Sequence, residues 1–337
     1  MIKPYNFKLD ITSHSNILRI ECVQGDINYG GIGNLIQPIR GVTFYFKRDA
    51  DLSMCNDAKL DKLKADGVNF IWLAFKFNAP TQTGNTMVPL VTTATVQAAY
   101  NKIVAKGFKI GFKPHVMWNS SAARYNPASP ATFIANYRTY FFQYLAMGSV
   151  WDYISITNEL EIVTRSNLTE WSSLITAIRA SSDALLICSC TYQELFTNVM
   201  LSQTDIIGCN LYPVLTAETT FTVDDLIAGF YWGKDDIRYI DGLNALSEQY
   251  GKPILMTEIG TGCYSDGMYN TALAGTIYDE EAQVKFYQAV FETLGVMENV
   301  HGLCWFECLT ETTDSFTFVD RPSEQIVQEN WGQYNVN

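Results

Sequence analysis

The 337-residue sequence lacks several features that would place it in a common functional class. No run of Lys or Arg is longer than two residues and the formal net charge is −12. Such a chain has no basic segment that could neutralise a row of phosphates. No apolar run reaches the roughly 18 residues that a membrane-spanning helix needs. We therefore expect neither nucleic acid nor a membrane as a partner.

Patterns for metals and cofactors are also missing. The chain has only three histidines, and no cluster of His, Cys, Asp or Glu has the spacing of a metal site. The stretch nearest to a dinucleotide fingerprint, YGGIGN at 29–34, comes before the first expected strand, so we interpret it as a flexible turn. We expect no metal and no cofactor.

The eight cysteines could form four disulfides, but their setting argues against this. Four of them, Cys188, Cys190, Cys209 and Cys304, lie within apolar, strand-like runs, where a free thiol behaves as a small hydrophobic group. The chain opens MIKPYNFKLD, without the apolar centre of a signal peptide. We interpret the thiols as mostly reduced and expect cytoplasmic synthesis without a signal peptide.

Short apolar runs recur from residue 39 onward, with polar or Gly/Pro-containing breaks between them. They cover residues 39–46, 68–75, 108–116, 152–160, 184–190, 205–212, 253–260 and 300–308. Apolar strands that alternate with helices are typical of a parallel sheet covered by helices, and a count of eight indicates closure. The expected fold class is α/β, a (β/α)8 TIM barrel over 39–337; a doubly wound open sheet is the alternative.

Helical patterns with recognisable starts lie between these runs. Thr92 and Ser129 stand at N-cap positions, and Asn167 has Glu170 three residues on, which is the capping-box spacing. The expected helices cover residues 56–67, 92–107, 129–148, 167–180, 279–295 and the tail from 323.

Residues 1–38 do not fit the repeat. The stretches FKLDIT and ILRIECV alternate like two short strands. We expect a short β-like extension, either a hairpin or an attachment segment, ahead of the barrel domain.

Polar residues at the strand ends are the candidate site residues, because TIM barrels build their active sites at the C-terminal ends of the strands. They are Lys113, His115 and Trp118 at the third strand, Asn158 and Glu159 at the fourth, Tyr212 at the sixth, Glu258 at the seventh and Trp305 at the eighth. A pair of carboxyl groups at one rim suits glycoside hydrolysis, in which one protonates the leaving oxygen and the other attacks or activates water. Either glutamate alone could be an ordinary solvated rim residue.

Four segments carry a resemblance to a known family. They are KPHV (113–116), NE (158–159), GKPILMTEIG (251–260) and CWF (304–306). The chain resembles clan A glycoside hydrolases and, more narrowly, glycoside hydrolase family 113, whose known members are endo-β-1,4-mannanases. The resemblance implies a retaining mechanism with Glu159 as acid/base and Glu258 as nucleophile.

The resemblance also implies roles for three neighbours of this pair. Tyr212 would hydrogen-bond Glu258, Asn158 would reach the sugar 2-hydroxyl, and Trp305 would form the stacking floor. The proposed chemistry requires a neutral Glu159, with a pKa raised by an apolar setting and by the nearby negative charge.

The third strand supplies the remaining binding candidates. His115 ends a strand after a proline and is expected to bind sugar hydroxyls, with a structural hydrogen bond as the alternative. Lys113 and Trp118 are expected beside it as substrate-binding residues.

Two hypotheses about function stay open at this stage. The first is hydrolysis of a polysaccharide or oligosaccharide, with β-1,4-mannan implied by the resemblance and other neutral β-linked polysaccharides open. The second is a catalytically inactive or weak carbohydrate-binding barrel, for example on a phage virion. Release by lysis, or attachment to a phage particle through residues 1–38, would bring a protein without a signal peptide to an external polymer. Enzymes of phosphorylated substrates are disfavoured, because no Gly-rich loop follows the seventh or eighth strand.

Overall fold

The computed structural model describes residues 8–9, 20–21, 39–119, 121–233, 236–273, 275–308 and 316–332. The chain divides into two compact units, Met1–Pro38 and Ile39–Asn337. In the first unit, β1 (Lys8–Leu9) and β2 (Ile20–Glu21) pair antiparallel, within the two stretches expected to be strands. The rest of this unit lies outside the described residues, and attachment to a phage particle stays a prediction.

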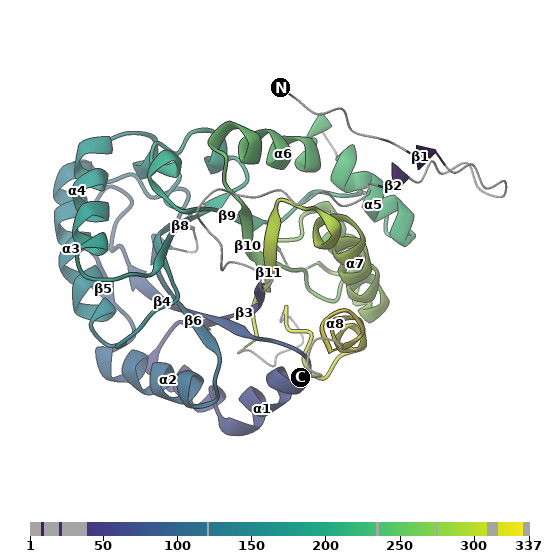
Figure 1. The fold of residues 1–337 in the computed structure, drawn as a ribbon, viewed down its shortest axis with the longest axis horizontal. Coiled ribbons are helices and arrows are strands. Elements are labelled where there is room, and N and C mark those ends of the chain that lie inside the picture. Colours follow the sequence, from purple (N-terminus) through teal and green to yellow (C-terminus); the bar gives the residue numbers. More distant parts are fainter. Residues whose placement is uncertain are drawn as a thin grey trace. The chain divides into compact units, whose positions relative to one another are not determined.

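Eight parallel strands of the second unit close into a barrel (Figure 1). They are β3 (Ile39–Phe46), β4 (Phe70–Asn78), β6 (Lys109–Met117), β7 (Tyr153–Asn158), β8 (Leu185–Thr191), β9 (Ile206–Leu211), β10 (Ile254–Ile259) and β11 (Val300–Trp305). Closure follows because β3 pairs with both β4 and β11. A short extra strand, β5 (Val88–Pro89), pairs antiparallel with the end of β4. The prediction of a (β/α)8 barrel is confirmed, and the open sheet is wrong.

Helices surround the barrel in Figure 1. They are α1 (Asp57–Ala65), α2 (Thr93–Ala105), α3 (Pro130–Leu145), α4 (Leu168–Arg179), α5 (Val223–Tyr231), α6 (Tyr239–Tyr250), α7 (Glu280–Thr293) and α8 (Ser323–Trp331). Short 3-10 helices are η1 (Asp49–Met54), η2 (Val163–Arg165), η3 (Glu194–Phe196), η4 (Leu201–Gln203), η6 (Ser265–Tyr269) and η7 (Leu294–Val296).

The helix starts agree with the sequence in two cases and differ in a third. The hydroxyls of Thr92 and Ser129 accept hydrogen bonds from backbone amides three residues on, as N-caps do. Asn167 instead has a left-handed backbone with a φ of 62° and makes no side-chain cap bond. Its amide donates to the Ser166 hydroxyl at 2.7 Å. The predicted capping box with Glu170 is therefore wrong, because this backbone turns the side chain away from the helix.

The apolar core has two layers, because successive residues of a strand point to opposite faces. The inner cluster draws its buried residues from the strands alone and fills the barrel; they are Ile39, Phe70, Trp72, Tyr153, Ile187, Ile206, Leu255 and Cys304. The larger outer cluster joins the strands to the helices. In β4, Phe70 and Trp72 are inner residues while Ile71 and Leu73 are outer ones. A Cβ on Gly111 of β6 would lie 2.2 Å from Trp72, so only glycine fits beside that ring.

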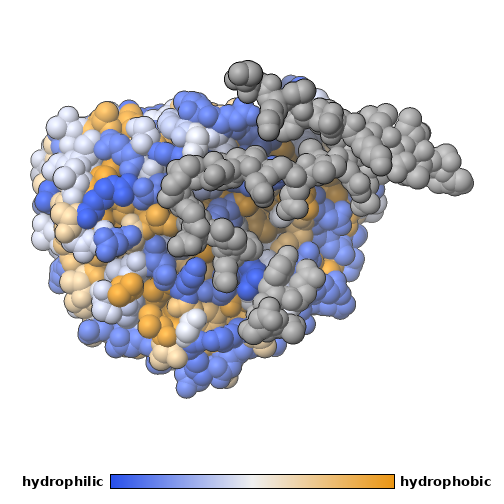
Figure 2. All heavy atoms as spheres, in the orientation of Figure 1, coloured by the Kyte–Doolittle hydropathy of each residue, from blue (hydrophilic) through white to orange (hydrophobic). Residues whose placement is uncertain are grey.

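The surface seen in Figure 2 intersperses apolar residues among hydrophilic ones over the helices, which is ordinary for a folded chain. None of the helices that the structure describes combines the length and the apolar character needed to cross a membrane. The seven cysteines among the described residues are all buried free thiols.

Candidate active site

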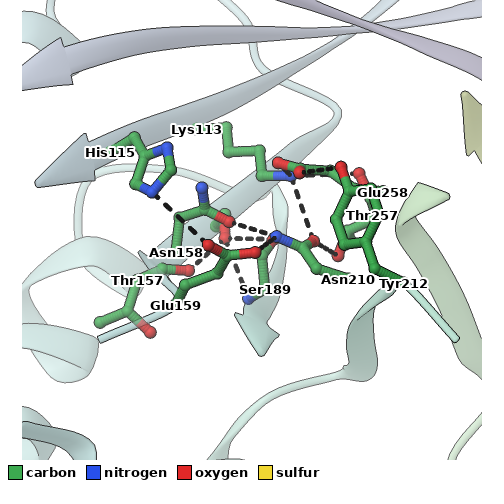
Figure 3. A network of polar contacts seen from close by, with 11 residues as sticks. Lys113, His115, Thr157, Asn158, Glu159, Ser189, Asn210, Tyr212, Thr257 and Glu258 are labelled. Carbon is green, nitrogen blue, oxygen red and sulfur yellow. Dashed lines mark hydrogen bonds and ion pairs between the residues drawn. The ribbon is translucent and has the colours of Figure 1, made fainter. Parts of the chain in front are cut away.

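Polar side chains from four strands converge at the C-terminal end of the barrel (Figure 3). They are Lys113 and His115 on β6, Asn158 and Glu159 at the end of β7, Asn210 and Tyr212 at the end of β9, and Thr257 and Glu258 on β10. Of the three substrate-binding residues predicted at the third barrel strand, Lys113 and His115 are in this group and Trp118 is not. The two glutamates thus share one site, linked through the amide of Asn210 and the ammonium of Lys113.

The backbone around Glu159 turns its side chain toward this site. The pairing of β7 with β8 shifts register between Ser155 and Asn158. Glu159 itself has a φ of 56°, a left-handed conformation that is uncommon for a residue with a side chain. Its backbone N–H donates to the Ser189 carbonyl at 2.8 Å, which holds the turn. Its side chain is 20% exposed, so it is accessible yet largely removed from water.

The surroundings of Glu159 favour its neutral form. Burial raises the pKa of this carboxyl most, and the negative charge of Glu258 raises it further. The hydrogen bond that Asn210 Nδ2 donates to Oε1 at 2.9 Å and the charge of Lys113 act in the opposite direction. The resulting pKa is about 7. Glu159 can therefore hold a proton at pH values where an ordinary glutamate has lost it.

Two donors hold the carboxyl group of Glu258. Lys113 Nζ lies 2.6 Å from Oε1, and the Tyr212 hydroxyl donates to Oε2 at 2.8 Å. Both partners donate hydrogen bonds, and donation to a carboxylate stabilises the anion. The expected hydrogen bond between Tyr212 and Glu258 is present. The two glutamates therefore differ in environment as an acid and a nucleophile must.

Lys113 does not have the role that the sequence suggested. Its side chain is 0% exposed, and its ammonium group donates to Glu258 Oε1, to the Thr257 carbonyl at 3.1 Å and to Asn210 Oδ1 at 3.4 Å. These three acceptors match the three N–H donors of an ammonium. The predicted contact of Lys113 with substrate is therefore wrong, because this lysine is fully engaged beneath Glu258.

Asn210 is a site residue that the sequence did not single out. Its Nδ2 donates to Glu159 and, at 2.9 Å, to Asn158 Oδ1. Its Oδ1 accepts from Lys113 and, at 2.7 Å, from the Thr257 hydroxyl. One amide therefore spaces the two carboxyl groups. Its place at the end of the sixth barrel strand, two residues before Tyr212, was the available signal.

Two buried polar atoms beside Glu159 have no hydrogen-bond partner among the described residues, His115 Nε2 and Asn158 Nδ2. His115 Nε2 lies 3.9 Å from Glu159 Oε2. Burial lowers the pKa of His115 to about 3, and the charges of Lys113 and Lys76 contribute, so the imidazole is neutral and this contact is no ion pair. Unsatisfied buried polar atoms are costly, and a ligand hydroxyl could satisfy both.

The structure corrects the position of the aromatic platform. Trp305 is 0% exposed, and its ring stacks on Tyr287 of α7 with centroids 3.7 Å apart. The predicted stacking floor at Trp305 is wrong, because this residue points to the outer layer. Phe306 follows on the opposite face and is partly exposed. Its ring lies 6.1 Å from that of Tyr212 and 6.2 Å from that of Tyr45.

Trp118 is the remaining candidate from the third barrel strand. It follows the end of β6, and its ring packs against the outer core cluster. It lines a hollow of about 340 Å³ together with Asn119, Ser121 and Arg124. The structure does not bring Trp118 into the network of Figure 3, and binding of substrate there stays a prediction. No group of His, Cys, Asp and Glu in the described part of the chain could hold a metal ion.

Comparison with protein families decides the classification of this site. The model described as Glycoside Hydrolase Family 113 matches residues 43–316, which is most of the chain and includes the whole network. The chain belongs to glycoside hydrolase family 113. The resemblance that the strand-end motifs predicted is thus confirmed, and the protein is a glycoside hydrolase by family.

Solved structures share the fold of this family 113 chain at low identity. A GH113 β-1,4-mannanase complex is 15% identical with a TM-score of 0.73, covering 88% of this chain and 99% of its own. A GH113 β-mannanase from Alicyclobacillus acidocaldarius is 16% identical with a TM-score of 0.74, covering 88% and 98%. A GH2 β-galacturonidase from Eisenbergiella tayi is 14% identical with a TM-score of 0.54, covering 88% and 51%. No curated protein sequence matches the chain.

Proposed function

We propose that this family 113 protein is a retaining, endo-acting glycoside hydrolase that cleaves β-linked polysaccharide, with β-1,4-mannan as the first candidate substrate. One observation carries the proposal: two glutamates at one site have opposite electrostatic settings. Glu159 has a pKa of about 7, whereas Glu258 is bound by an ammonium and a phenol donor. Double displacement needs this division between an acid and a nucleophile.

The reaction would proceed in two steps. Glu258 attacks the anomeric carbon, and the bond to the leaving oxygen breaks as Glu159 gives that oxygen its proton. The products of this step are the shortened glycan and a glycosyl ester on Glu258. Glu159, now ionised, takes a proton from water, the resulting hydroxide attacks the anomeric carbon, and the ester bond breaks to regenerate the Glu258 carboxylate.

Three neighbours would position the sugar for this reaction. Asn158 Nδ2 and His115 Nε2 offer the two unsatisfied polar atoms beside Glu159, and sugar hydroxyls can both donate and accept. Phe306, rather than Trp305, would provide the aromatic face, because it is the partly exposed ring at the eighth strand. Stacking of an aromatic ring against a sugar buries apolar C–H groups without costing hydrogen bonds.

Mannan is the first candidate because the solved GH113 structures that share the fold are described as β-1,4-mannanases. The alternative is a carbohydrate-binding barrel without turnover. Such a protein would gain nothing from a buried Lys113–Glu258 ion pair, because taking both charges out of water costs several kcal/mol. We further propose that residues 39–337 carry the activity and that residues 1–38 form a separate extension.

The test is hydrolysis of a panel of β-linked polysaccharides by the wild type, Glu159→Ala and Glu258→Ala. Wild type should release oligosaccharides from at least one polymer, with the β-anomer formed first by NMR. Either substitution should lower the rate by about a thousandfold or more, as loss of an essential acid or nucleophile does. Glycan binding without turnover by the wild type would support the binding barrel instead, and release of the α-anomer would refute the retaining mechanism.

A further inference from the structure

Lys76 is a cationic side chain at the inner rim of the barrel that the network of Figure 3 does not include. It lies near the C-terminal end of β4, four residues beyond the inner residue Trp72, and its partner across the ladder is His115. Residues paired across a parallel ladder point to the same face of the sheet. Because His115 points toward Glu159, Lys76 lies on the face that bears the reacting groups. Its side chain is partly exposed, so a ligand can reach it.

A second lysine approaches the same place from β3. Lys47 follows the end of that strand, and its Nζ lies 5.4 Å from the centre of the Tyr45 ring. The Tyr45 ring in turn lies 5.4 Å from that of His115. Burial lowers the pKa of Lys76, and the charge of Lys47 lowers it further. Two lysines therefore flank the pair formed by Tyr45 and His115.

The charges at this rim do not balance among the described residues. Lys113 pairs with Glu258 at 2.6 Å and Lys47 with Glu307 at 3.4 Å. Lys76 forms no ion pair and no side-chain hydrogen bond with any residue that the structure describes. Its neighbour His115 is neutral. A partly buried ammonium without a counter-charge loses hydration and regains nothing from the protein.

We propose that Lys76, assisted by Lys47, binds the carboxylate of a hexuronic acid unit next to the cleaved bond, so that the natural substrate is an acidic β-linked polysaccharide. This inference rests on the proposed glycoside hydrolase function and replaces neutral β-1,4-mannan, the first candidate taken from the solved relatives, by an acidic polymer. A carboxylate offers two acceptor oxygens and a full counter-charge, whereas a sugar hydroxyl would leave the charge of Lys76 uncompensated. Lys47 can share the ligand, because Glu307 occupies only part of its three donors.

A matched pair of substrates tests the proposal. Oligosaccharides of β-1,4-linked mannose and of β-1,4-linked mannuronate have the same linkage and ring configuration and differ in the group at C6. We expect wild type to have the higher kcat/KM for the mannuronate series. Lys76→Met keeps the aliphatic stem and removes the charge, and should lower the ratio of kcat/KM for acidic over neutral substrate by at least about tenfold, which a charge-assisted hydrogen bond supplies.

A control variant separates this effect from a general loss of lysine charge. Lys285→Met makes the same chemical change on α7, where Lys285 contacts the Phe221 ring, and should leave the ratio and the basal rate unchanged. An equal loss on both substrates in Lys76→Met would overturn the proposal, since Lys76 would then act on a feature common to both sugars. A wild type that prefers the neutral series would overturn it as well.

A binding measurement keeps this proposal distinguishable from the proposed function. Glu159→Gln mimics the neutral acid while removing the proton donor. Calorimetric titration of this variant with two pentasaccharides, one of β-1,4-linked mannose and one of β-1,4-linked mannuronate, therefore reports binding without turnover. Tighter binding of the acidic pentasaccharide that is lost in Glu159→Gln/Lys76→Met would support the carboxylate site even if the wild type hydrolyses nothing. Hydrolysis of neutral mannan together with equal binding of the two pentasaccharides would refute only the carboxylate site.

Discussion

The raised pKa of Glu159 makes the stability of the protein depend on pH in a way that one substitution removes. The pKa is about 7 in the folded chain against an ordinary value of 4.5. A carboxyl group with a raised folded-state pKa contributes most stability when it is protonated in both states, below about pH 4.5. That contribution is lost as the pH rises through the folded-state pKa, because the buried group must then ionise.

The size of the effect follows from the difference between the two pKa values. A difference of about 2.5 units, at roughly 1.36 kcal/mol per unit, gives about 3 kcal/mol between pH 4 and pH 8.5. Glu159→Gln replaces the protonated acid by a neutral group of the same shape that does not titrate. Relative to its value at pH 4, the free energy of unfolding of this variant should therefore exceed that of the wild type by about 3 kcal/mol at pH 8.5.

Urea unfolding of both proteins at half-unit intervals between pH 4 and pH 8.5 measures this difference. Glu161→Gln is the matched control, because Glu161 lies two residues on and its carboxylate forms an ion pair with Arg165 in solvent contact. The control should follow the wild type to within about 0.5 kcal/mol, as surface substitutions usually do. A difference between Glu159→Gln and wild type that does not change with pH would refute the reasoning that burial holds Glu159 neutral.

Three further predictions concern activity and packing. On the basic side, log kcat/KM should fall with an apparent pKa near 7, the value for Glu159. Glu159→Gln should lose most of the activity, and its residual activity should no longer fall with that pKa. Residual activity of Glu159→Gln that still falls with a pKa near 7 would contradict this prediction. Lys113→Met leaves Glu258 buried without its cation. Urea unfolding should therefore show a loss of about 3 to 5 kcal/mol in the free energy of unfolding, and assays should show a lower kcat. A rise in KM with unchanged kcat would instead indicate that Lys113 contacts the substrate. Trp305→Ala should cost about 3 to 5 kcal/mol of stability through a cavity, whereas Phe306→Ala should mainly weaken glycan binding in calorimetry; the reverse pattern would restore Trp305 as the platform.

The barrel was predictable from the sequence because its signals are local and repeated. Each of the eight apolar runs overlaps one barrel strand, and strands buried on both faces need no tertiary information to be recognised. The two glutamates were predictable for a related reason, since the topology alone carries the ends of parallel strands to one rim. The sequence could not give the left-handed turn at Glu159, because that backbone depends on the neighbouring strand.

Trp305 and Phe306 show where sequence reasoning about this site failed. Both are aromatic, and the motif CWF does not say which ring faces the substrate. Strand alternation decides the question, because Cys304 belongs to the inner cluster and Trp305 to the outer one. Because Phe306 lies two residues after Cys304, alternation places it inward as well. The sequence alone, however, does not show that the Cys304 side chain faces inward. The prediction for Lys113 failed for a different reason. Its hydrogen bond to Glu258 joins residues 145 positions apart in the sequence, and no local pattern reveals such a contact.

The chemistry of Asn210 explains how two glutamates at one rim can have different partners. A carboxamide has a donor end and an acceptor end, and here the donor end faces Glu159 and Asn158 while the acceptor end faces Lys113 and Thr257. A carboxylate in its place would repel both glutamates, and an apolar residue would leave the Lys113 ammonium short of an acceptor. With the amide fixed by Thr257 on one side and Asn158 on the other, Lys113 stays on the side of Glu258. The cation is thereby committed to one carboxyl group, and the other is left neutral by burial.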